Sequence, residues 1–177
     1  MDFSQDHFAL FGLPRRYALD EAALGRLYHE FQARVHPDKH AHLSDTEQRL
    51  AMQWTTRINE AYQVLRQPLS RAKYLLSLCG VDVDHGREMS PEFLMKQMEW
   101  RETVAEARAA GDAARLEMLH GQLKRELAQE YAQLGAGLAP EPVSAAQAAA
   151  AVKLVRQLMF QEKLLHEIDE ALAAAEA

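Results

Sequence analysis

Apolar residues recur at helical spacing along nearly the whole chain, and this feature most restricts how the chain can fold. After Asp20, an apolar side chain returns to the same helix face at each turn. These residues are Leu24, Leu27, Tyr28, Phe31 and Val35. No stretch alternates apolar and polar residues for more than a few positions, and the sequence has no internal repeat. The sequence therefore predicts an all-α fold.

Residues typical of helix boundaries divide the first half into four helices. Asp6 and Asp20 can each accept hydrogen bonds from the free N–H groups of a first turn. Ser44 followed by Glu47 has the pattern of a capping box, and Pro68 suits the first turn of a helix. The expected helices run from Asp6 to Gly12, from Asp20 to Val35, from Ser44 to about Arg66 and from Pro68 to about Leu78.

Three long helices are expected in the second half. Ser90 can cap the first of them, and Gly111 followed by Asp112 ends that helix and starts the next. Ser144 can cap the last helix, and residues 135–142, with two glycines and two prolines, are expected to be a plain loop. Because short connections favour antiparallel neighbours, the three helices are predicted to form an antiparallel bundle.

The two halves differ in charge and meet at a break in the helical pattern near Cys79. Residues 1–78 carry ten Lys or Arg against nine Asp or Glu, whereas the rest carries ten against 17. We expect an N-terminal four-helix domain over 1–78, a linker or elbow over 79–89 and a C-terminal three-helix bundle over 90–177. Together they are expected to form an L.

Composition excludes several classes of function. The net charge of −6 argues against a general nucleic-acid binder, and 48% hydrophobic residues is too much for a disordered chain. A single cysteine, Cys79, allows no internal disulfide and no Cys-rich zinc or iron–sulfur site. Cys79 follows an apolar helix and is expected to be buried and inert. We find no signal peptide, transit peptide or membrane span, so we expect a soluble, cytoplasmic protein.

One loop stands out because it places rigid polar side chains between two helices. It reads His36-Pro37-Asp38-Lys39. Pro37 fixes its own φ and pushes His36 out of the helical region, so Asp38 is expected on a stiff loop. Such loops suit recognition, although an isolated tripeptide of this kind is more often a helix stop with a solvated turn.

The flanks of this loop change that interpretation. The loop follows an amphipathic helix, and two further segments match in order: Asp6 to Leu13 before that helix, and Ile58 to Leu65 after the loop. The set resembles the J-domain of DnaJ-type co-chaperones over residues 1 to about 75. His7-Phe8 stands where that family usually has paired tyrosines, a departure expected to affect only packing.

The remaining segments narrow the resemblance. General DnaJ proteins would have a Gly/Phe-rich linker and cysteine repeats after the J-domain, and this chain has neither. Three stretches instead match a more specialised family of J-domain proteins: 67–78, 93–102 and 155–164. Nearly the whole chain is thereby similar to the HscB family, the J-type co-chaperones of bacterial iron–sulfur cluster assembly. The resemblance implies two protein partners, the DnaK-type ATPase chaperone HscA and the scaffold protein IscU. It implies no cofactor, no catalysis, and no nucleic-acid or membrane partner.

The resemblance assigns the loop residues His36, Pro37 and Asp38 to HscA, where they would trigger ATP hydrolysis. Arg26 and Arg34 lie eight residues apart on similar helix faces, and with Lys39 they could meet an acidic partner. Exposed arginines are also ordinary, and Glu30 lies between these two at i, i+4 spacing.

A second surface is expected on the C-terminal bundle. The helix after Ser90 has a core-like stripe of Phe93, Gln97, Trp100, Val104 and Ala107. Three other apolar residues of this helix, Leu94, Met95 and Met98, lie roughly 100–200° around the helix from Phe93. Phe160 lies about 200° from the expected core seam of the last helix. That seam comprises Leu154, Leu158, Leu165, Ile168 and Leu172. An apolar patch rimmed by charge suggests protein binding.

The resemblance places IscU on this patch. The matching residues are Leu94, Met95, Met98, Glu99, Glu102 and Phe160. Alternatively, these side chains pack against the N-terminal domain or within the bundle, with Leu94 and Met98 the first candidates for the core.

Three other interpretations remain open. The loop holds His36, Asp38, His40 and His42, which could bind a metal. A hydrolase using a His–Asp pair is weaker, because no nucleophile stands at motif spacing. Finally, the chain could be a J-domain protein for a different client.

Overall fold

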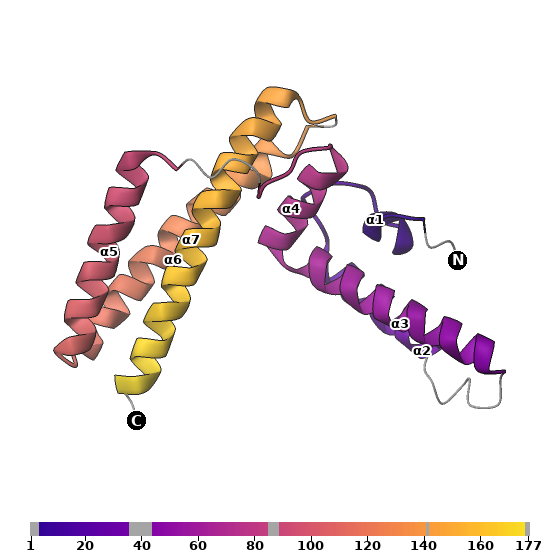
Figure 1. The fold of residues 1–177 in the computed structure, drawn as a ribbon, viewed down its shortest axis with the longest axis horizontal. Coiled ribbons are helices and arrows are strands. Elements are labelled where there is room, and N and C mark those ends of the chain that lie inside the picture. Colours follow the sequence, from indigo (N-terminus) through magenta and orange to yellow (C-terminus); the bar gives the residue numbers. More distant parts are fainter. Residues whose placement is uncertain (1–3, 36–43, 85–88, 141, 176–177) are drawn as a thin grey trace. The chain divides into compact units, whose positions relative to one another are not determined.

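The computed structural model describes residues 4–35, 44–84, 89–140 and 142–175. Over these residues the chain forms helices and no strand, which confirms the predicted all-α fold (Figure 1). The chain divides into two compact units, Met1–Leu75 and Leu76–Ala177.

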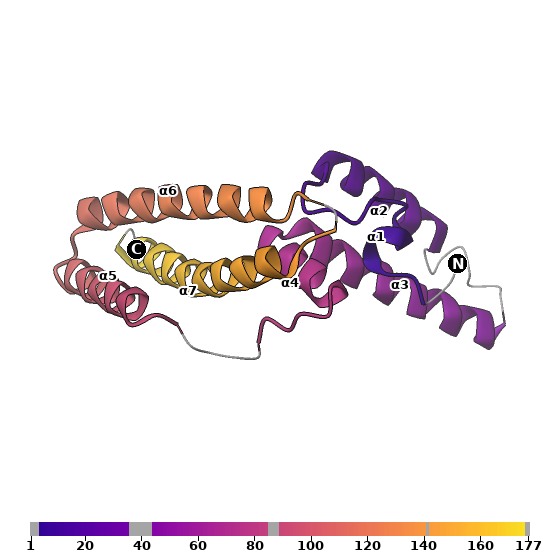
Figure 2. The ribbon, with the colours of Figure 1, turned by 90° about the horizontal axis from the view of Figure 1, so that it is seen from above.

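The first unit is built from four helices: α1 (His7–Leu10), α2 (Glu21–Val35), α3 (Asp45–Arg66) and most of α4 (Pro68–Leu78). Helices α2 and α3 pack against each other and run antiparallel, because Tyr28 contacts Tyr62 while Gln32 reaches back to Asn59. Figure 2 shows the two helices with α1 beside them. The core of the unit consists of Phe8, Leu10, Phe11, Leu24, Trp54, Ile58, Ala61 and Leu65.

Polar side chains start these helices where the sequence predicts. The Asp6 carboxylate accepts hydrogen bonds from the backbone N–H groups of Phe8 (2.8 Å) and Ala9 (3.0 Å). Ser44 and Glu47 form a capping box at the start of α3, which satisfies two N–H groups that have no partner inside the helix.

The second unit is a three-helix bundle of α5 (Pro91–Ala109), α6 (Ala113–Gly137) and α7 (Ala145–Ala175) (Figure 2). Ser90 caps α5, and Gly111 adopts a φ of +63° before Asp112 caps α6, as predicted. A left-handed φ is cheap only for glycine, so Gly111 permits the tight reversal between the two helices.

Helix α6 continues through residues that the sequence analysis assigned to a loop. It ends at Gly137, so the expected loop over 135–142 is wrong in its first three residues. Leu134 and Leu138 are both buried in the bundle. Burial of these two side chains outweighs the roughly 1 kcal/mol by which each glycine disfavours a helix.

The predicted core seam of α7 is right at two positions and displaced at three. Leu158 and Ile168 are buried, whereas the other three predicted positions are only half-buried. The fully buried neighbours are instead Val155 and Leu164. Helix α7 has 31 residues and packs against both α5 and α6, so it buries a broad stripe of side chains. A line of residues at heptad spacing gradually turns away from the middle of that stripe.

Cys79 is exposed, so the expectation that it is buried is wrong. It follows the last residue of α4, and Gly80 then takes a φ of +76° as the chain leaves the helix. The apolar side chain buried at this helix end is Leu76. None of the helices in the described parts of the chain is both long and apolar enough to cross a membrane.

Candidate protein-docking surfaces

The predicted motif His36-Pro37-Asp38-Lys39 lies outside the described residues, as do His40 and His42. The helices before and after it are described, and side chains link them. The rings of Tyr28 and Tyr62 stack with centroids 3.9 Å apart. The side-chain oxygen of Asn59 accepts hydrogen bonds from the Tyr28 hydroxyl (3.0 Å) and from the Gln32 amide (2.8 Å). These contacts fix how α2 pairs with α3.

The two arginines predicted to contact a partner lie on α2, and both are exposed. Glu30, between them, is exposed as well. The guanidinium of Arg34 lies 5.8 Å from the ring centroid of Phe31, within the range of a cation–π contact. Arg34 therefore lies beside an apolar residue of the same helix, while Arg26 points away from the core.

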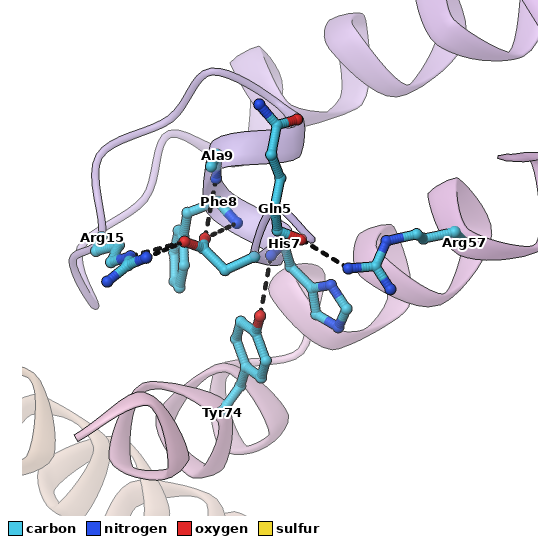
Figure 3. Close-up of polar contacts among 8 residues, drawn as sticks. Gln5, His7, Phe8, Ala9, Arg15, Arg57 and Tyr74 are labelled. Carbon is cyan, nitrogen blue, oxygen red and sulfur yellow. Dashed lines mark hydrogen bonds and ion pairs between the residues drawn. The ribbon is translucent and has the colours of Figure 1, made fainter. Parts of the chain in front are cut away.

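At the start of the chain, His7 occupies a site that aromatic packing defines (Figure 3). Its buried ring stacks on the ring of Tyr74 with centroids 4.3 Å apart. The His7 backbone N–H donates to the Tyr74 hydroxyl (2.9 Å), and the Arg57 guanidinium donates to the Gln5 carbonyl (2.6 Å). These contacts tie α1 to both α3 and α4.

The pKa of His7 reflects this position. Burial, reinforced by the positive charge of Arg57, lowers the pKa of His7 below its ordinary value, although Glu60 and Asp6 act in the opposite direction. Its Nδ1 atom is buried with no hydrogen-bond partner. The neutral imidazole is therefore the form that this site favours.

In the second unit, α5 has the two faces that the sequence predicts. All five residues of its expected core stripe are buried: Phe93, Gln97, Trp100, Val104 and Ala107. On the opposite side, the exposed fractions are 43% for Leu94, 63% for Met95 and 71% for Met98. The apolar residues of this second face are therefore not part of the core.

Phe160 belongs to the same region of the bundle although it lies on α7. Its ring contacts the Phe93 ring edge to face, with centroids 6.1 Å apart, and it remains 40% exposed. Further along, the Arg101 guanidinium lies 3.8 Å from a Glu167 carboxylate oxygen. In both contacts the α7 residue stands almost the same number of positions after its α5 partner in the sequence. The residue numbers therefore rise together along the two helices, which means that α5 and α7 run parallel.

This offset places Leu94 and Phe160 on the two sides of one seam. Leu94 lies seven residues before Arg101 and Phe160 lies seven residues before Glu167, so each shares a helix row with a residue of the ion pair. Glu99 and Glu102 are exposed on the outer face of α5. We call this set, Leu94, Met95, Met98, Glu99, Glu102 and Phe160, the α5–α7 surface.

The α5–α7 surface has the chemistry of a protein-binding site. Methionine side chains are flexible and polarisable, and they adapt to the shape of a partner. Exposed apolar groups next to carboxylates are typical of interfaces. Within the described segments, no group of three or more His, Cys, Asp or Glu residues is placed to hold a metal ion.

The sequence analysis missed a groove that begins at Phe160. It has a volume of about 380 Å³ and lies where the chain before α5 meets the outer face of α7. Its lining residues are Val83, Asp84, Met89, Arg156, Met159 and Phe160. Val83 was assigned to a linker, but it is buried, and its carbonyl accepts a hydrogen bond from Arg156 Nε (2.8 Å). The apolar spacing of Val81 and Val83 was the only signal in the sequence.

Comparison with known proteins gives consistent results. Residues 89–169 match the family described as the HSCB C-terminal oligomerisation domain. A co-chaperone protein HscB homolog from Azoarcus sp. (strain BH72) is 55% identical over 178 residues, which cover 99% of this chain and 98% of that protein.

Two solved structures share the fold. Chaperone HscB from Vibrio cholerae superposes with a TM-score of 0.85 at 34% identity, over 97% of this chain and 99% of that one. Human co-chaperone protein HscB gives a TM-score of 0.87 at 26% identity, over 96% of this chain and 83% of that one.

Proposed function

Because this chain belongs to the HscB family of co-chaperones, a class without enzymatic activity, we propose that it is an adaptor between two proteins. It carries the iron–sulfur scaffold protein IscU to the DnaK-type chaperone HscA and stimulates ATP hydrolysis by HscA. The observation that carries this proposal is the exposure of the apolar side chains of the α5–α7 surface, which fold stability alone does not explain.

The first unit is proposed to contact HscA. His36, Pro37 and Asp38 would trigger hydrolysis, and Arg26 with Arg34 and Lys39 would add positive charge facing an acidic surface of the chaperone. The exposure of Arg26 and Arg34 on α2 supports this role. Electrostatic contacts of this kind mainly speed association and orient the partners.

The α5–α7 surface is proposed to hold IscU. Met95 and Met98 supply most of its exposed apolar area, and Phe160 supplies an aromatic side chain next to the α5–α7 seam. Aromatic anchors at the centre of an interface often dominate its binding energy. Glu99 and Glu102 would select a partner with basic groups beside its apolar contact.

Tethering explains how one small chain helps a chaperone to act on a chosen client. A client bound to one unit is held near a chaperone bound to the other, so their encounter becomes effectively intramolecular. Effective concentrations in the millimolar range are typical of short connections. The chain itself makes and breaks no covalent bond in this scheme.

Capture of purified IscU tests the client assignment. Phe160→Ala and Met98→Ala should each weaken capture by about tenfold or more, because each removes an apolar contact. Met118→Ala is the matched control, since Met118 is 63% exposed on α6, outside the α5–α7 surface. All three variants should keep the circular dichroism of the wild type.

The outcome also separates the alternatives. If wild-type protein does not bind IscU, a J-domain protein for a different client becomes the better assignment. Metal analysis of the purified protein addresses the metal-binding alternative, for which stoichiometric zinc or iron would be the positive result.

A further inference from the structure

The groove beside Phe160 has the dimensions and lining of a binding site for apolar side chains. Its volume of about 380 Å³ falls within the roughly 300–1,000 Å³ of typical ligand pockets. Met89 and Met159 contribute flexible thioether side chains, and Val83 and Phe160 contribute apolar groups of fixed shape. The groove therefore suits one or two aliphatic or aromatic side chains.

One wall of the groove is held in place by the fold. Val83 is 5% exposed, and its carbonyl accepts a hydrogen bond of 2.8 Å from Arg156 Nε on α7. This bond uses a polar atom of Arg156, the one basic residue among the described residues of the lining, and fixes the chain next to α7. A groove that exists before binding costs its ligand less ordering entropy than one that must form.

The groove is continuous with the α5–α7 surface because Phe160 is part of both. Phe160 contacts Phe93 at the start of α5 on one side and lines the groove with Met159 on the other. A protein that covers Phe160 while bound to Leu94 and Met98 therefore reaches the mouth of the groove.

We propose that the client-binding surface extends past Phe160 into this groove, which takes an apolar side chain of the same client. The inference rests on the proposed function and adds a second subsite, formed by Met89 and Met159, to the six residues of the α5–α7 surface. Two separated apolar contacts would fix the orientation of the client as well as its affinity.

Methionine methyl groups provide a direct test. The full chain carries seven methionines, of which Met95 and Met98 report on the α5–α7 surface and Met89 and Met159 report on the groove. In the wild-type protein labelled with ¹³C at the methionine methyls, addition of IscU should shift the signals of all four. Met52 and Met118, which are exposed on α3 and α6, should not shift.

The pattern of shifts distinguishes the possible failures. Shifts at Met95 and Met98 without shifts at Met89 and Met159 would overturn the second subsite and leave the proposed function intact. No shift at any methionine would contradict both the second subsite and the proposed binding of IscU. Shifts of Met89 and Met159 with protein concentration alone, before IscU is added, would assign the groove to a second copy of this chain and also overturn the inference.

A charge substitution gives an independent measurement. Met159→Glu places a carboxylate in the apolar groove and should raise the Kd for IscU by about tenfold or more. Met159 is 38% exposed, so the variant should fold. Met118→Glu is the matched control and should leave the Kd unchanged. Equal Kd values for Met159→Glu and the wild type would contradict the proposal.

Discussion

The buried imidazole of His7 is one of the groups that join α1 to the rest of the first unit. His7 stacks on Tyr74, and its backbone N–H donates to the hydroxyl of the same tyrosine. The charged groups that face the imidazole are Arg57 and Glu60 from α3 and Asp6 from the same turn. Protonation of His7 would place a second positive charge beside Arg57 in a desolvated site, so it opposes docking of α1.

This arrangement predicts how stability depends on pH. The folded-state pKa of His7 is lowered, so the unfolded state binds a proton more readily than the folded state below pH 6.5. The contribution of His7 is fully present above that pH and is lost as pH falls toward the folded-state pKa. Urea unfolding followed by Trp54 fluorescence, in a Trp100→Phe background, should show a midpoint that drops between pH 8 and pH 5.5.

His7→Phe keeps an aromatic ring at this site and removes the titrating group. Its urea midpoint should depend less on pH than that of the parent protein. His166→Gln, at an exposed position on α7, is the control and should retain the parent's pH dependence. Identical pH profiles for His7→Phe and the parent would contradict the role assigned to the buried imidazole.

At the residue scale, the sequence identified the candidate surface but not its accessibility. Leu94 and Phe93 are neighbours in sequence with similar hydrophobicity, yet one is exposed and the other is buried. Periodicity assigns Phe93 to the core stripe and Leu94 to a second apolar face, but only tertiary packing decides whether that second face is covered by another part of the chain or left exposed. Cys79 shows the same limit, because the point at which α4 leaves the core depends on the turn at Gly80.

At the scale of elements, α5 is held by its cap and its flanks as well as by its core stripe. Ser90 Oγ accepts a hydrogen bond from the Phe93 backbone N–H (3.3 Å). Lys96 pairs with Glu126 of α6 (2.8 Å) on one flank, and Arg101 pairs with α7 on the other. The ion pairs are solvent-exposed and each contributes about 1 kcal/mol or less, so the cap matters at least as much.

Loss of this cap should destabilise the bundle. Ser90→Ala removes the acceptor for the Phe93 N–H and should lower the free energy of unfolding by about 1 kcal/mol. Trp100 fluorescence during urea unfolding, in a Trp54→Phe background, measures the change in the second unit. Ser90→Asp restores a capping side chain and should recover most of the loss. An Ala variant as stable as the wild type would show that the cap contributes nothing.

Most element boundaries could be predicted because capping is local chemistry. Asp6, Ser44, Ser90 and Asp112 all cap helices where the sequence indicates. The boundary of α6 could not be predicted, because Gly135 and Gly137 favour a loop and only the burial of Leu134 and Leu138 keeps them helical. The site predictions on 36–39 remain predictions, since these residues lie outside the described part of the chain.

At the scale of the whole molecule, tethering requires that two binding activities be connected in one chain. The unit proposed to bind the client and the unit proposed to contact the chaperone are each compact. If tethering is the mechanism, the length and stiffness of the connection should matter in addition to the groove residues that it contributes. Effective concentration falls as a flexible connection lengthens.

Insertion of a flexible Gly/Ser segment after Gly80 tests this point, because it lies before the Val83 carbonyl that Arg156 holds on α7 and leaves the groove lining intact. The variant should bind IscU with wild-type affinity and stimulate HscA normally when no client is present. The additional stimulation that depends on IscU should decrease, because the client is held less closely to the chaperone. An insertion of matched length in the 138–143 connection, inside the second unit, is the control. Unchanged IscU-dependent stimulation would show that the connection plays no part.

The most direct test of the adaptor account is the steady-state ATPase rate of HscA, measured with this protein in the presence and absence of IscU. The wild type should raise the rate, and IscU should raise it further. His36→Gln should abolish both effects while keeping helical content and IscU capture, whereas Phe160→Ala should lose only the IscU-dependent part. A wild-type protein that leaves the ATPase rate unchanged, or a His36→Gln variant that stimulates it normally, would contradict the account.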